Sequence, residues 1–155
     1  MRAVDILART DICWDMKTDP FIGDRVFVYG TLRRGFINND ATLAFREGAS
    51  FIAEGTLPGG LYSVGWYPAL IEGEEGRVHG EVWKITQPGI MHILDDYEGL
   101  FDDGPPEYQR ARRMVETAQG RIEAWAYIYL YEVDPMQRLP KGDWADAFNT
   151  PGVSG

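Results

Sequence analysis

The hydrophobic pattern along the chain predicts a protein built mainly from strands. Runs rich in β-branched and aromatic residues recur, and glycine, proline or acidic turns separate them. The expected strands are Val26–Tyr29, Phe51–Leu57, Leu61–Val64, Ala69–Ile71, Arg77–Ile85, Tyr108–Thr117 and Arg121–Tyr131. Because strands dominate without regular alternation of strand and helix, the pattern predicts an α+β fold. We expect a small mixed β-barrel, or a strongly curled mixed sheet, with flanking short helices.

Helical periodicity appears in two places. Polar residues 38–40 can cap a short helix through Ala41–Arg46. A second helix is indicated by Ile90, Ile93, Leu94 and Tyr97, which follow the spacing of one helical face. We expect the two helices to flank the sheet.

The chain length of 155 residues predicts one domain with a substantial core. We place the domain at residues 25–145, after an N-terminal extension of residues 1–24 and before a C-terminal tail of residues 146–155. From Asp134 onward, several prolines and glycines predict coil with one short turn.

The stretch Arg25–Gly35, which reads RVFVYGTLRRG, has the pattern of a buried strand that opens into a loop. Gly30 ends the apolar run, and we expect glycine there because a residue without Cβ bends freely into a turn. Backbone N–H groups at such a rim need an acceptor, and an anionic ligand or a developing oxyanion would serve. The ordinary alternative is a strand end whose amides face water.

Charge and composition narrow the classes of partner. The formal net charge of −9 would repel phosphate backbones and anionic lipid, so we expect neither nucleic acid nor membrane partners. Cys13 is the one cysteine, and His79 and His92 have no metal-ligand spacing, so neither a disulfide nor a metal site is expected. These features suit a cytoplasmic protein.

The acidic end of the second helix, Leu94–Gly99 (LDDYEG), holds the candidate general acid/base. At about 100° per residue, Glu98 lies about 80° from Ile90 and borders the apolar stripe, whereas Asp95 lies further round. Partial burial and the negative end of the helix dipole would raise the pKa of Glu98, as proton exchange near neutral pH requires. The alternative is a structural ion pair between Glu98 and Arg110 or Arg112.

Short motifs along the chain resemble the γ-glutamylcyclotransferase-like superfamily, in particular its γ-glutamylamine cyclotransferase branch. That family opens with a strand running into Tyr-Gly-Ser/Thr-Leu-Arg, which Tyr29, Gly30, Thr31 and Leu32 match. The other matching segments, in order, are Gly80–Trp83, Leu94-Asp95 with Glu98-Gly99, Tyr108–Arg110 and Gly142–Trp144. The likeness spans Val26 to about Trp144.

The resemblance implies a small mixed barrel and an enzyme that closes a γ-glutamyl amine or peptide to 5-oxoproline. Glu98 would be the catalytic residue. Tyr29, Gly30, Thr31, Leu32 and Tyr108 would bind the substrate. The substrate's own α-amine would be the nucleophile, so no cofactor and no metal are implied.

Two other functions remain open at this point. The same fold could serve as a non-catalytic module that binds a small molecule or interacts with a partner. The same site with a wider mouth could also carry out acyl transfer or hydrolysis on a γ-glutamyl-protected metabolite. The leaving amine and the oligomeric state are not specified by these motifs.

Overall fold

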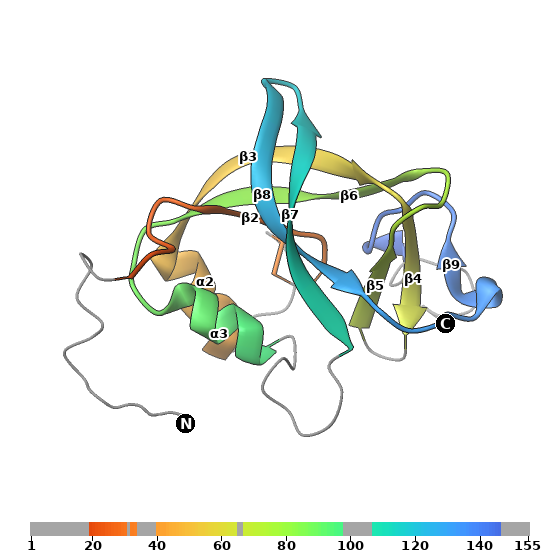
Figure 1. Cartoon of the computed structure of the whole chain (residues 1–155), viewed down its shortest axis with the longest axis horizontal. Helices are drawn as coiled ribbons and strands as arrows, with labels where there is room; N and C mark the ends of the chain where they lie inside the picture. The colour runs from red at the N-terminus through yellow and green to blue at the C-terminus, as the bar shows by residue number, and fades with distance from the viewer. Residues whose placement is uncertain (1–18, 31, 34–39, 65–66, 98–106, 147–155) are drawn as a thin grey trace.

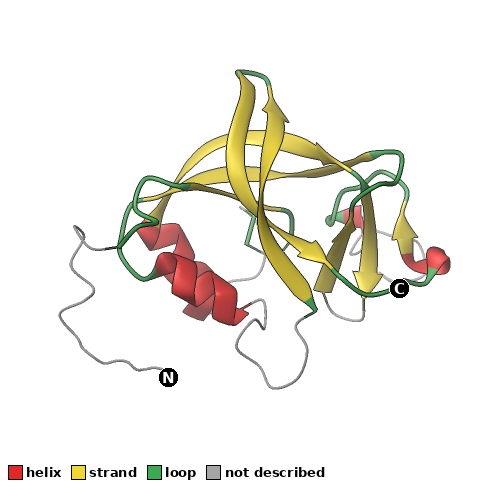
Figure 2. Ribbon diagram, in the orientation of Figure 1, coloured by secondary structure: helices red, strands yellow, loops and turns green. Residues whose placement is uncertain are grey.

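The computed structural model describes residues 19–30, 32–33, 40–64, 67–97 and 107–146. Figure 1 shows how the elements follow one another, and Figure 2 separates helices from strands. The helices are α2 (Asp40–Gly48), α3 (Ile90–Tyr97) and the short 3-10 helix η2 (Pro135–Gln137). The strands are β2 (Arg25–Val28), β3 (Ala49–Pro58), β4 (Gly60–Val64), β5 (Tyr67–Ile71), β6 (Arg77–Ile85), β7 (Tyr108–Thr117), β8 (Gly120–Tyr129) and β9 (Arg138–Leu139).

The main sheet closes into a barrel in the order β2-β6-β3-β7-β8. Its ladders are antiparallel except where β2 meets β8, which it joins in parallel at Val26 and Trp125. Strand β2 therefore lies between β6 and β8, in the interior position expected for this apolar run. The predicted fold, a small mixed barrel with flanking short helices, is confirmed.

A smaller sheet in the order β5-β4-β9 lies beside the barrel (Figure 1). Strand β9 pairs with β4 through Leu61 and Leu139. The expectation of coil from Asp134 onward is wrong for this segment, which also buries Trp144 to 2% exposure. A two-residue strand and a single tryptophan have no periodicity, so only their long-range partners define them.

Side chains of β2 alternate between two apolar clusters. Phe27 belongs to a cluster that also contains Val82, Val115 and Trp144, which we call the barrel interior. Val26 and its neighbours on the other face pack with residues of the two helices, and we call this cluster the helix-facing side. Figure 2 shows α2 and α3 together below the strands.

Residues 19–24 pack against the barrel and α3. The Asp19 carboxylate accepts a hydrogen bond from the Gly89 amide, 2.8 Å away, at the start of α3. The Phe21 ring meets the Trp125 ring edge-on, with centroids 6.1 Å apart. The division of the chain at residues 24 and 145 stays a prediction.

Candidate functional site

The predicted binding loop begins where β2 ends. Tyr29 and Gly30 are buried, and the Arg33 amide donates to the Gly30 carbonyl over 3.1 Å, which closes a turn. Leu32 points into the helix-facing core and is 4% exposed. Thr31, the remaining predicted loop residue, lies outside the described residues.

Gly30 is required here for space. Its φ does not lie in the left-handed region that favours glycine. A Cβ at this position would lie 2.7 Å from Cγ of Pro68, closer than side chains tolerate. The chain turns at Gly30 as expected, but the turn does not need the left-handed conformation of glycine, and the missing Cβ is what lets β5 approach the loop.

Pro68 joins the predicted loop to the predicted tyrosine. The Tyr108 hydroxyl donates to the Pro68 carbonyl over 2.6 Å, while the Pro68 ring rests against Gly30. The structure thus brings Gly30 and Tyr108 to the same residue of β5. The sequence did not predict Pro68 as a site residue, because no local pattern indicates its contacts with Gly30 and Tyr108, which are far away in the chain.

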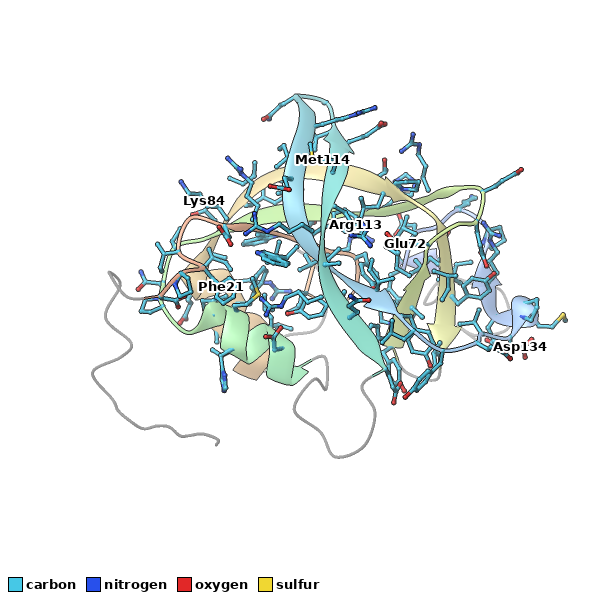
Figure 3. All side chains as sticks on the ribbon, in the orientation of Figure 1. Phe21, Glu72, Lys84, Arg113, Met114 and Asp134 are labelled. Carbon is cyan, nitrogen blue, oxygen red and sulfur yellow. The ribbon has the colours of Figure 1, made fainter. Side chains whose placement is uncertain are left out.

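An ion pair just past the end of β5 makes a second contact with β7. Arg113 of β7 and Glu72, the residue that follows β5, face each other (Figure 3), with two nitrogens of the guanidinium bonded to the carboxylate. Hydrogen bonding from Arg113 lowers the pKa of Glu72 against the opposing effect of burial. Pro68 is therefore fixed relative to Tyr108 by contacts at both ends of the strand.

The hydroxyl of Tyr29 is bonded to the backbone. It donates to the Tyr127 carbonyl on β8 over 2.6 Å, and its ring belongs to the barrel interior. A phenol hydrogen-bonded to the neighbouring strand anchors the start of the loop. A contact between Tyr29 and substrate stays a prediction.

Asp95 of α3 points toward the core and is 7% exposed. Its Oδ1 accepts a hydrogen bond from the Tyr127 hydroxyl at 2.6 Å and lies 3.3 Å from Nε of Arg110. The interpretation that Asp95 lies away from the core is wrong. Glu98, the predicted catalytic residue, lies outside the described residues.

Burial dominates the electrostatics of Asp95. Desolvation raises the pKa of its carboxyl, and the Tyr127 hydroxyl and the Arg110 charge only partly oppose this. The Arg110 guanidinium packs on the rings of both Phe21 and Trp125, at 4.8 and 4.9 Å from their centroids. Figure 3 shows Phe21 between the strands and α3. The arginine charge is thus held beside Asp95 by aromatic faces.

The arginines considered as partners of Glu98 have other carboxylates nearby. Arg110 pairs with Asp95. Arg112 lies 3.7 Å from Asp24 and 3.5 Å from Glu123. Whether Glu98 pairs with either arginine stays a prediction, because Glu98 lies outside the described residues.

Among the described residues, no group of histidine, cysteine and acidic side chains is arranged to hold a metal ion. In the same part of the chain, no helix is both long enough and apolar enough to cross a membrane.

Comparison with known proteins assigns the chain to a family. Residues 26–146 match the model of the gamma-glutamyl cyclotransferase, AIG2-like family, and the chain belongs to it. It is an enzyme of the γ-glutamylcyclotransferase type.

Its relatives include bacterial and mammalian proteins. One relative is a Vibrio cholerae protein, named for a gamma-glutamylcyclotransferase activity that its name gives as unproven. It is 36% identical over 77% of this chain and 93% of its own length. The gamma-glutamylaminecyclotransferase of Rattus norvegicus is 30% identical, over 61% of this chain and 64% of the rat protein. The crystal structure of an AIG2-like protein from Mus musculus is similar with a TM-score of 0.59 and 27% identity, covering 74% of this chain and 82% of the mouse chain.

Proposed function

We propose that this protein cyclises a γ-glutamyl amine or peptide to 5-oxoproline and releases the amine. The substrate's α-amine nitrogen attacks its own γ-carbonyl carbon, which forms the ring bond. The bond from that carbon to the leaving nitrogen then breaks. Glu98 takes the proton that the attacking nitrogen loses and returns it to the leaving amine, so atoms and charge balance without a redox partner. The substrate is a small molecule, and a cytoplasmic location remains a prediction.

The observation that carries the proposal is the convergence of Gly30 and Tyr108 on Pro68 within the segment that matches the family. Two motifs distant in sequence thereby contact the same residue of β5. Loop amides beside these contacts would hold the γ-glutamyl group and stabilise the oxyanion, where each well-placed donor is worth about 10²–10³-fold.

The hydrogen bonds of the tyrosines support giving the proton transfer to Glu98. Tyr29 and Tyr108 each donate the hydroxyl proton to a backbone carbonyl. A phenol used in this way is a poor proton shuttle, because moving its proton would break a buried hydrogen bond. We therefore give both tyrosines, with Gly30, Thr31 and Leu32, the function of shaping the binding site.

The test is Glu98→Gln, assayed by 5-oxoproline release from a panel of γ-glutamyl amines and γ-glutamyl dipeptides. The variant keeps the size of the side chain and loses the proton acceptor, so kcat should fall by about 10²-fold or more. Affinity for 5-oxoproline, measured by calorimetry, should persist. Glu123→Gln changes an exposed acid of β8 in the same way and should keep full activity.

Two outcomes would contradict the proposal. If Glu98→Gln melts early and still turns over substrate, Glu98 stabilises the fold and is not the base. If the unaltered protein binds 5-oxoproline and cyclises no member of the panel, the fold serves as a binding module.

A further inference from the structure

The Gly-Asp-Trp motif near the C-terminus packs against β6 in a fixed place. The His79 amide donates to the Gly142 carbonyl over 2.8 Å. Gly142 has a φ of +67°, and a Cβ there would lie 1.8 Å from the Arg77 carbonyl oxygen. Trp144 is 2% exposed and packs in the barrel-interior cluster. Residues on both sides of Asp143 are therefore locked, and the carboxylate between them has a defined position.

That carboxylate contacts the glycine loop. Oδ1 of Asp143 lies 2.9 Å from Nη1 of Arg33 and accepts the Ala145 amide at 2.9 Å. The two side chains of the ion pair are 16% exposed for Arg33 and 34% exposed for Asp143. Burial raises the pKa of Asp143, but the bonds from Arg33 and Ala145 outweigh it and keep the pKa below the ordinary value.

Arg33 is the residue through which the loop leaves the site. Its amide closes the turn onto Gly30, and its carbonyl accepts Nη2 of Arg46 on α2 over 3.0 Å. Earlier in the loop, Gly30 is confined by Pro68 and Leu32 is buried. The start of the loop at Gly30 is thus fixed by packing. Its end at Arg33 depends on hydrogen bonds to α2 and to the C-terminal Gly-Asp-Trp motif.

We propose that Asp143 is a positioning residue for the loop: through Arg33 it fixes the loop exit, and so the direction of the backbone amides that bind the γ-glutamyl group. This inference rests on the proposed function, because that function supplies the ligand of the loop. It gives the Gly-Asp-Trp motif a function at the site, over a distance of 110 residues in sequence. Misplacement of binding groups by a fraction of an ångström is costly for a reaction that depends on holding the substrate folded.

The experiment is a double-mutant cycle with Asp143→Ala and Arg33→Ala, read by KM for the best γ-glutamyl substrate and by calorimetric affinity for 5-oxoproline. Loss of one partly buried, charged hydrogen bond should raise KM, and lower the affinity for 5-oxoproline, by about 5–10-fold in each single variant. The double variant should be no worse than either single one, because both remove the same contact. Asp143→Asn keeps the acceptor oxygen and should recover most of the affinity.

Glu116→Ala provides the matched control. It removes the partly exposed carboxylate that pairs with Arg77 at 3.2 Å and with Arg121 at 3.6 Å, at the far end of β7. Its KM should equal that of the unaltered protein. Hydrogen exchange of peptides spanning residues 25–45 should speed up in Asp143→Ala and not in Glu116→Ala.

Different results would contradict the positioning by Asp143 and the cyclotransferase activity itself. If the unaltered protein releases 5-oxoproline while KM is unchanged in Asp143→Ala, or the two single effects add, Asp143 does not act through Arg33 and the inference is overturned. If no γ-glutamyl compound is turned over, the proposed function fails, and unchanged exchange in the loop of Asp143→Ala would overturn the inference separately.

Discussion

The barrel interior and the helix-facing side are both well buried, yet they are built differently. The interior packs apolar side chains such as Phe27, Val82 and Val115 against one another. The helix-facing side also buries the carboxylate of Asp95 and the hydroxyl of Tyr127, joined by a short hydrogen bond. Shape is the main requirement inside, whereas the other face depends on the direction of hydrogen bonds. The two faces of the same strands are therefore stabilised in different ways.

The strongest test of this contrast is Phe27→Ala. The side chain is 1% exposed, so its removal leaves a cavity in the interior and should cost about 3–5 kcal/mol of unfolding free energy. Denaturant unfolding would measure the loss. A cost below about 1 kcal/mol would show that the interior collapses around the gap and is loosely packed.

A smaller cost is expected for Asp95→Ala on the helix-facing side. The change leaves the Tyr127 hydroxyl and the Arg110 guanidinium without their carboxylate, which should cost about 1–3 kcal/mol. Chemical denaturation near neutral pH is the measurement. A variant as stable as the unaltered protein would mean that this polar cluster contributes specificity without stability.

The isosteric change Asp95→Asn tests the sign of the pKa shift. Since burial raises the pKa of Asp95, the folded protein binds its proton more tightly than the unfolded chain. The stabilisation of the folded state by this proton binding is fully present below the ordinary aspartate pKa and is lost as pH rises through the raised value. Relative to the unaltered protein, Asp95→Asn should therefore gain stability across that interval. A difference independent of pH would contradict the shift.

Tyr108→Phe should have the smallest effect. It removes the hydrogen bond to the Pro68 carbonyl and keeps the ring, so we expect a cost of about 1 kcal/mol. Tyr67→Phe is the control, since its hydroxyl contacts Glu107 at an exposed position, and it should change stability by less than about 0.5 kcal/mol. Equal costs would show that the buried bond does not fix β5 more firmly than the exposed one.

Local pattern determined much of the fold from the sequence. The bounds predicted for Arg77–Ile85, Tyr108–Thr117 and the Ile90–Tyr97 helix agree with β6, β7 and α3. Each is long enough for its local pattern to show the type of element, and neighbouring residues supply that information. The order of short motifs along the chain likewise indicated the family, because it combines several weak local signals.

Only the tertiary structure decided how the site is held together. Asp95 can be buried because Arg110 of β7 and Tyr127 of β8 bind its carboxylate. The helical periodicity of α3 carries no information about these two strands. Gly30 is needed because Pro68 approaches it, and Arg33 is fixed by an aspartate near the other end of the chain. In each case the energy comes from a partner distant in sequence, so the residue type could be predicted while its neighbour could not.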